Sequence, residues 1–423
     1  MRTPNFNVRL TVICFAAASV GLSIALISIA KLLLFATAIF SLISFGRSQI
    51  GRPVLTQSYV PAIILLILAT LCASLLWTNG PLDEGLNSLG KYGKLLSIVA
   101  LMALIQNRQD AAYALVAFLL AQTTLLLGSW ALYVGIPVPW ATSNMALTHY
   151  SVFSAYLDQS IMSSVTAAVF WHLRGLAPTK FLRGLVIAIA ALAMVNVLFV
   201  LIGRTGHVVA IALLSLAIMW ELPKKMRLAV VVLPFILVAV LSVSSTKVNE
   251  RLSLVLTEVQ SFSTGEQLDT SSGIRLSLWR RAVQMIATEP VKGFGVGNWN
   301  HQYDTRQREQ NPAHVNVTTK ANTHQEYLQW GVQLGVPGIL LFVGLMACIL
   351  RDSLKMEPQF ARATQSVLVA FAVTCLFNSA LYDAHIGDFF CVALGLMLAL
   401  GLQKSGFKSP QTTTTGSRAG VLA

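Results

Sequence analysis

Residues 185–220, LVIAIAALAMVNVLFVLIGRTGHVVAIALLSLAIMW, contain two apolar runs joined by the tetrapeptide Gly203-Arg204-Thr205-Gly206. Each run approaches the roughly 20 apolar residues with which a helix crosses a bilayer. The four residues between the runs leave no room for a loop. The stretch therefore predicts two membrane-spanning helices joined by a tight turn, which holds Arg204 at the membrane boundary.

The remainder of the chain has the same character. Of its 423 residues, 55% are hydrophobic and 11% are charged, and the mean hydropathy is +0.68. A soluble domain carries about 25% charged residues, so a cytosolic globular enzyme is disfavoured. We expect about twelve membrane spans, at these positions: two in Leu10–Phe45 with a break near Ser28–Lys31, then Val60–Trp77, Leu95–Gln106, Ala111–Gly135, Ile161–Leu173, Leu185–Ile202, His207–Trp220, Leu228–Val243, Glu326–Leu350, Thr364–Leu381 and Phe389–Gln403.

These spans predict an all-α polytopic membrane protein in four parts. Residues 1–243 contain the first nine spans, and residues 244–323 form one large outer loop with amphipathic helices. Residues 324–403 contain the last three spans. Residues 404–423 form a polar cytoplasmic tail that we expect to be disordered.

The net charge of +13 is explained by this topology. With the N-terminus in the cytoplasm, the inner segments hold 17 basic and four acidic residues, which gives 17 − 4 = +13, and the outer segments hold 13 of each sign. The whole excess therefore lies where the positive-inside rule expects it. Because the basic residues are spread over seven short loops, a nucleic-acid-binding surface is disfavoured.

The large outer loop has nine basic and seven acidic residues and is long enough to have structure of its own. Its residue pattern predicts an amphipathic helix over Val248–Phe262 and a second helix over Ile274–Thr288. The string Gly293-Phe294-Gly295-Val296-Gly297 is either a weak phosphate-binding signal or a bent loop under close packing. The polar stretch Tyr303–Val317 is predicted to be a mobile segment.

Three basic side chains at the outer boundary could do chemistry. Arg204 is either an anion clamp or a residue that reaches lipid headgroups, and Arg275 is either a second clamp or a solvated helix residue. Two arginine forks would match the oxygens of a pyrophosphate. His324, where the loop re-enters the membrane, could accept a proton near neutral pH, although a single histidine is more often structural.

Motifs for other chemistries are absent from the sequence. It has no Walker loop, nucleophile elbow or zinc motif. Asp383, His385 and Asp388 could form a weak metal site, but their spacing matches no established metal-binding motif, and we expect no metal or other cofactor. A reaction on the outer face has no access to cytoplasmic nucleotides, and its energy would arrive in an activated, lipid-linked pyrophosphate.

Three segments in order resemble one known family. They are Gly203-Arg204-Thr205-Gly206, then Arg275…Trp279…Ala282…Pro290…Gly293-Phe294-Gly295-Val296-Gly297, then Thr323-His324-Gln325-Glu326-Tyr327-Leu328…Gly335…Gly338. They are similar to the motifs of the O-antigen ligase and O-antigen polymerase superfamily, in detail over about Leu185–Phe342. The resemblance implies a membrane-embedded glycosyltransferase of the GT-C type in a bacterial inner membrane, with its site facing the periplasm. It also implies a metal-independent, inverting transfer.

The resemblance also implies roles for single residues. Arg204 and Arg275 match two arginines thought to hold the donor pyrophosphate, and His324 matches a histidine proposed to activate the acceptor hydroxyl. Gln325 replaces the usual asparagine, which leaves the role of that position open. The additional candidate contacts are Tyr327, Gln325, Arg280, Lys91 and Lys94, of which the two lysines could instead anchor a helix end.

Within the superfamily, the chain is most similar to ligases that join O-antigen to lipid A-core. Their donor is O-antigen on undecaprenyl pyrophosphate, and lipid A-core and membrane lipids are the other partners. Polymerases tend to have two sizeable outer loops, whereas the second one here, Ile136–Ser160, has no basic residue. Protein O-oligosaccharyltransferases are usually longer. A transporter or flippase is disfavoured because the predicted spans lack charged residues and the two halves show no repeat.

Overall fold

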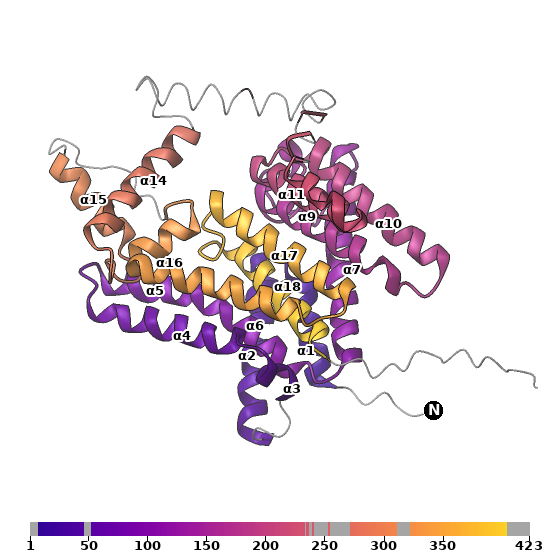
Figure 1. The fold of residues 1–423 in the computed structure, drawn as a ribbon, viewed down its shortest axis with the longest axis horizontal. Coiled ribbons are helices and arrows are strands. Elements are labelled where there is room, and N and C mark those ends of the chain that lie inside the picture. The colour runs from indigo at the N-terminus through magenta and orange to yellow at the C-terminus, as the bar shows by residue number, and fades with distance from the viewer. Residues whose placement is uncertain are drawn as a thin grey trace, which may run out of the picture.

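The computed structural model describes residues 7–45, 52–232, 234–236, 239–240, 253, 271–310 and 322–403. Within this part of the chain the regular structure is entirely helical, which confirms the all-α fold class (Figure 1). The α-helices are α1 (Val8–Ser19), α2 (Ile24–Phe45), α3 (Arg52–Gln57), α4 (Val60–Ala73), α5 (Leu82–Tyr92), α6 (Leu96–Leu104), α7 (Arg108–Tyr133), α8 (Ala146–His149), α9 (Tyr156–Leu173), α10 (Lys180–Val195), α11 (Arg204–Glu221), α14 (Ser271–Thr288), α15 (Trp299–Gln310), α16 (Glu326–Ser353), α17 (Pro358–Phe377) and α18 (Ala384–Gly401). Short 3₁₀ or π segments follow several of them: η2 (Ser74–Leu76), η3 (Gly93–Leu95), η4 (Arg174–Leu176), η5 (Asn196–Val200) and η6 (Lys224–Val231).

Seven of the described helices are long and apolar enough to cross a membrane: α2, α7, α10 with η5, α11, α16, α17 and α18. Two shorter apolar helices, Val8–Ser19 and Val60–Leu76, accompany them. These helices fit a multi-pass membrane protein. The count of about twelve spans stays a prediction, because part of Leu228–Val243 (residues 233, 237–238 and 241–243) lies outside the described residues. The predicted tail, residues 404–423, lies wholly outside them.

The predicted break in the first apolar stretch was placed wrongly. The chain turns between α1 and α2 at Val20–Ser23, not near Ser28–Lys31. Gly21 makes the turn with φ +89°, and its missing side chain leaves room for the amide of Gln122. That amide donates to the carbonyl of Val20 at 2.6 Å. Lys31 consequently lies inside α2 rather than at its boundary.

The tight turn before α11 is confirmed, and its glycines explain it. The π-helical segment η5 ends at Val200, and α11 begins at Arg204. A Cβ atom at Gly203 or Gly206 would overlap the side chain of Ser160 on α9. The two glycines therefore let α11 pack closely on α9, and Arg204 is fixed as the first residue of its helix.

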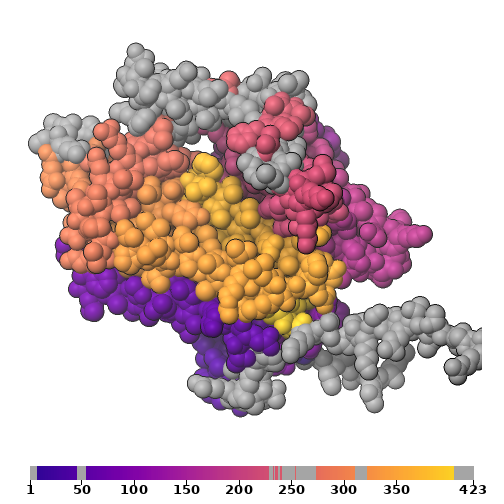
Figure 2. Space-filling view, in the orientation of Figure 1, coloured from indigo at the N-terminus to yellow at the C-terminus, as the bar shows by residue number. Residues whose placement is uncertain are grey.

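The described part of the outer loop packs onto α16. Leu278 and Met285 of α14 form a buried cluster with Trp299 of α15 and Val332 of α16. In the space-filling view, the surface of α14 and α15 lies against that of α16 (Figure 2). The prediction of mobility was wrong for residues 303–310, which belong to α15, because the buried Trp299 anchors that helix. The predicted helix Val248–Phe262 and residues 311–317 lie outside the described residues.

The glycine string is a packing element. Gly295 and Gly297 have φ +88° and +76°, and a Cβ atom on them would meet the chain at Ser74–Thr78 and at Glu84–Gly85, respectively. The N–H groups of Phe294 and Gly295 donate to carbonyls of α16 at 2.9 and 2.8 Å, so they are not available to a phosphate. Close packing is therefore the correct interpretation of the two that the sequence left open.

Candidate functional site

His324 has an unusual backbone conformation. Its φ is +52°, in the left-handed region, which costs a non-glycine residue on the order of 1–3 kcal/mol. Its N–H donates to the side-chain oxygen of Asn322 at 2.8 Å. The hydroxyl of Thr323 both donates to the carbonyl of Gln325 and accepts from its N–H, at 2.6 and 3.2 Å. Side chains on both sides of His324 thus hold the strained turn, and the residue itself is half-buried.

Gln325 caps the helix that follows. Its side-chain oxygen accepts a hydrogen bond of 2.6 Å from the N–H of Leu328, in the first turn of α16. Asparagine is among the most favourable residues at a helix N-cap. The cap explains why either glutamine or asparagine can occupy this position, and it gives Gln325 a structural role.

We expect Gln325→Ala to lower the free energy of unfolding by about 1 kcal/mol, because an N–H in the first turn of α16 loses its partner. Gln325→Asn should keep the cap and remain within a few tenths of a kcal/mol of wild type. Thermal unfolding of both variants in detergent would measure this. Equal destabilisation by the two substitutions would contradict the capping role.

The residues after Gln325 connect α16 to the bundle. The buried carboxylate of Glu326 accepts hydrogen bonds from the indole of Trp330 and from the N–H of Leu381, at 2.9 and 3.0 Å. The hydroxyl of Tyr327 donates to the carbonyl of Ala372 on α17 at 3.2 Å. Tyr327 therefore supports the position of α16, which fits its geometry better than a substrate contact.

A polar cavity of about 540 Å³ lies next to this turn. We call it the lysine cavity; its lining includes Lys31, Asn87, Lys91, Lys94, Asn322, Tyr382, Asp383 and Asp388. Asn322 is the residue that accepts from the N–H of His324. The cavity and the histidine are therefore joined through one side chain.

The charges in the lysine cavity favour an anion. Lys31 forms an ion pair with Asp388 at 2.8 Å, and Lys94 donates to the backbone carbonyl of Asp383. The ammonium of Lys91 lies 3.6 Å from the centre of the Tyr382 ring. Burial lowers the pKa of Lys94 and raises the pKa of Asp383. An anion bound here would offset the burial of Lys94 and favour its charged form.

Lys31 and Asp388 were not predicted as site residues. Their ion pair lies within two membrane-spanning helices, α2 and α18, so the expectation that the spans lack charges was wrong. The signal was a lysine within a run of apolar residues, which is costly in a membrane and marks a functional position. The misplaced break near Ser28–Lys31 concealed it.

We expect Lys31→Met to destabilise the protein by about 1–3 kcal/mol, because the buried carboxylate of Asp388 loses its ion-pair partner. The double variant Lys31→Met/Asp388→Met should recover most of this loss, since it removes both charges. Denaturation of the four proteins of this cycle would measure the coupling. Additive losses would show that the two residues do not interact.

The predicted arginines lie on separate elements. Arg204 begins α11, and Arg275 lies on α14; both are half-buried. Arg280, on the same helix as Arg275, is exposed. Packing of α14 against Leu328 and Val332 places that helix over the first turns of α16, just after His324.

Helix direction relates Arg204 to the rest of the bundle. Glu221, at the opposite end of α11 from Arg204, accepts a hydrogen bond of 2.7 Å from Arg174. Arg174 lines a cavity together with Pro358, the first residue of α17. We call this the Glu221 end of the bundle, and α17 begins there.

The same reasoning places His324. Gln365, near the start of α17, donates to the hydroxyl of Ser353, the last residue of α16, at 3.1 Å. Glu326, the first residue of α16, accepts from the N–H of Leu381, which follows the end of α17. Because α17 begins at the Glu221 end, the start of α16 and His324 lie at the opposite end. Arg204 and His324 therefore share one end of the bundle, which we call the His324 end.

The acidic residues at the start of α18 make contacts with lysines. Asp388 pairs with Lys31, and Asp383 lies beside Lys94. Among the residues that the structure describes, no group of three His, Cys, Asp or Glu side chains is placed to hold a metal ion.

Comparison with known families agrees with the motifs. No protein of curated function matches the chain at a significant level. Residues 189–343 match the family model described as O-antigen ligase. This segment runs from α10 into α16 and includes Arg204, Arg275 and His324. This match covers less than half of the chain and supports its membership of the O-antigen ligase and polymerase superfamily.

Proposed function

We propose that this protein is an O-antigen ligase. It transfers O-antigen from undecaprenyl pyrophosphate to a sugar hydroxyl of lipid A-core, at the periplasmic face of a bacterial inner membrane. The superfamily supports a ligase-type or polymerase-type membrane glycosyltransferase. The observation that carries the proposal is the strained, side-chain-supported turn at His324, beside a cavity that favours anions.

In the proposed step, the imidazole of His324 accepts the proton of the acceptor hydroxyl. The hydroxyl oxygen attacks the anomeric carbon of the donor, and a new glycosidic C–O bond forms. The C–O bond to the pyrophosphate breaks in the same step, and its electron pair leaves with undecaprenyl pyrophosphate. Attack from the opposite side inverts the anomeric centre.

Cationic side chains would stabilise the leaving group. Arg204 and Arg275 would bind the donor pyrophosphate, and Lys91 and Lys94 would add positive charge from the lysine cavity. Negative charge grows on the pyrophosphate as its bond breaks, so positioned cations lower the barrier. We propose that this arrangement makes the transfer independent of a metal ion.

Reconstitution with purified components would test the function. The purified protein receives undecaprenyl-pyrophosphate glycan and lipid A-core, with EDTA and without nucleotide, and product is followed by a gel shift. We expect glycan on lipid A-core. Longer glycans on the polyprenyl carrier would indicate a polymerase, and transfer only to a protein acceptor would indicate a protein O-oligosaccharyltransferase. No product from folded protein with any acceptor would favour a transporter.

A further inference from the structure

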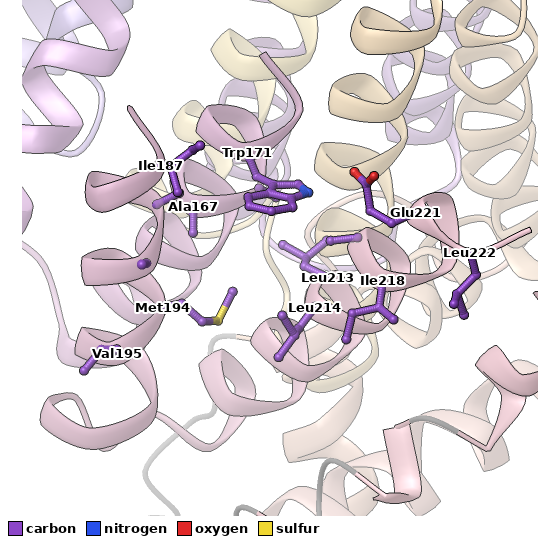
Figure 3. A pocket seen from close by; sticks show the side chains of 14 residues that line it. Ala167, Trp171, Ile187, Met194, Val195, Leu213, Leu214, Ile218, Glu221 and Leu222 are labelled. Carbon is purple, nitrogen blue, oxygen red and sulfur yellow. The ribbon is translucent and has the colours of Figure 1, made fainter. Parts of the chain in front are cut away.

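An apolar cavity of about 490 Å³ lies between α9, α10 and α11 (Figure 3). Its lining is almost entirely alanine and large aliphatic side chains, with Trp171 and Glu221 at one side. On α11 the lining runs from Leu213 to Glu221, the half of the helix nearer the Glu221 end, and it continues to the C-cap residue Leu222. This volume lies within the range of ligand pockets, and its chemistry suits a hydrocarbon chain.

A second, polar cavity of about 440 Å³ lies at the Glu221 end. We call it the arginine cavity; it is lined by His172, Arg174, Gly175, Arg183, Glu357, Pro358, Gln359 and Arg362. It is formed by the end of α9, the segment η4 and the starts of α10 and α17. These elements are separate from those around His324.

The arginine cavity has an excess of positive charge. Glu221 pairs with Arg174, and Glu357 pairs with Arg108 through two bonds of 2.9 and 3.1 Å. Two further arginines on the lining, Arg183 and Arg362, have no carboxylate partner among the described residues. Four arginines and two glutamates give 4 − 2 = +2 at this site.

Two further features point to an anionic ligand. The Nε2 atom of His172 is buried and has no hydrogen-bond partner in the described part of the chain, although its side chain lines this cavity. The 20-residue helix α17 begins here with Pro358, so the free N–H groups of its first turn face the same region. Helix N-termini attract negative charge.

Arg174 joins the two cavities. Its guanidinium lies 3.9 Å from the centre of the Trp171 ring and donates to Glu221, and both of these residues line the apolar cavity. On α10, Arg183 of the arginine cavity is one turn from Ile187 of the apolar cavity. The cationic and the apolar space therefore adjoin.

We propose that these cavities together bind an anionic glycerophospholipid of the leaflet at the Glu221 end, which is the cytoplasmic leaflet in the predicted topology. Its phosphate lies in the arginine cavity, on Arg183, Arg362 and His172. One acyl chain lies in the apolar cavity. A soluble anion would use the first cavity only, so the apolar space beside it favours a lipid; basic pockets between membrane helices bind acidic headgroups elsewhere.

The test uses the purified protein, delipidated in detergent, with phosphatidylglycerol, phosphatidylcholine or sn-glycerol 3-phosphate as probes. We expect phosphatidylglycerol to raise the melting temperature and to remain bound in native mass spectrometry, since a ligand of the folded state stabilises it. Arg183→Gln/Arg362→Gln should weaken this binding about tenfold or more. Arg351→Gln is the matched control. Arg351 lies at the same end of the bundle but stacks on Tyr59 outside both cavities, so this variant should bind phosphatidylglycerol as wild type does.

A second variant tests the contribution of the apolar cavity separately from that of the arginine cavity. Ala191→Phe should fill the apolar cavity and weaken binding of phosphatidylglycerol, with both arginines intact. Equal binding of phosphatidylcholine, unchanged binding by the double arginine variant, or equal stabilisation by sn-glycerol 3-phosphate would each overturn the proposal. Glycan transfer is not part of the readout, so the result is independent of the proposed function.

Discussion

Replacement of His324 by glycine is expected to reduce glycan transfer by about 10²–10⁴-fold, the usual contribution of a positioned general base. Glycine is the informative substitution because it adopts φ +52° without strain, so the turn is kept and only the imidazole is removed. Alanine would remove the imidazole and leave the strain. Initial rates with saturating donor and acceptor, together with the melting temperature, measure chemistry and folding separately.

Two further variants make this experiment decisive. His324→Asn tolerates the left-handed conformation but is not a base, so it should be as inactive as the glycine variant. His301 is an exposed histidine on α15, and His301→Ala should transfer glycan at the wild-type rate. Transfer close to wild type by folded His324→Gly would exclude this histidine as the base.

Arg204→Lys and Arg275→Lys are each expected to lower kcat/KM for the donor by about 10²–10³-fold, the size of effect seen when one positioned donor to a developing anion is lost. Lysine keeps the charge but not the planar fork that binds two phosphate oxygens. The loss should appear with the pyrophosphate-linked donor, with the KM for the acceptor unchanged. Titration of each substrate at a fixed level of the other separates these effects.

Arg308→Lys is the matched control for both arginines, because it makes the same exchange at an exposed position of α15. It should leave both kinetic constants unchanged. Wild-type kinetics in Arg204→Lys or Arg275→Lys would show that a point charge suffices and that no bidentate clamp exists at that position.

The sequence predicted the large features of the fold because they follow from hydrophobic length. The turn at Arg204, the helix over Ile274–Thr288 and the entry of the chain into α16 after His324 could all be identified from runs of apolar residues and their boundaries. The break between α1 and α2 could not, because it depends on one glycine facing Gln122 on a helix about a hundred residues away.

The candidate site likewise combines residues that local sequence motifs indicate with contacts that depend on the packing of distant helices. Motif order indicated Arg204, Arg275 and His324, but the lysine cavity depends on which helices lie side by side. The pairing of Lys31 with Asp388 joins residues from opposite ends of the chain, and no local pattern reports such a contact. The capping role of Gln325 was also hidden, since it depends on the backbone direction set by the turn at His324.

The close fit of the glycine string has a consequence for protein engineering. A Cβ atom on Gly293 would meet the backbone of Gln333 and Gly335 at the kink in α16, and one on Gly335 would meet the backbone of Pro290 and Val291. Gly297 fits against α5 in the same way. Residues 271–310 therefore cannot be exchanged without the segments on which they pack. A chimera that takes this segment alone from a homologue would place mismatched side chains at these close backbone contacts, so the α4–α5 corner and the first half of α16 should be exchanged together with it.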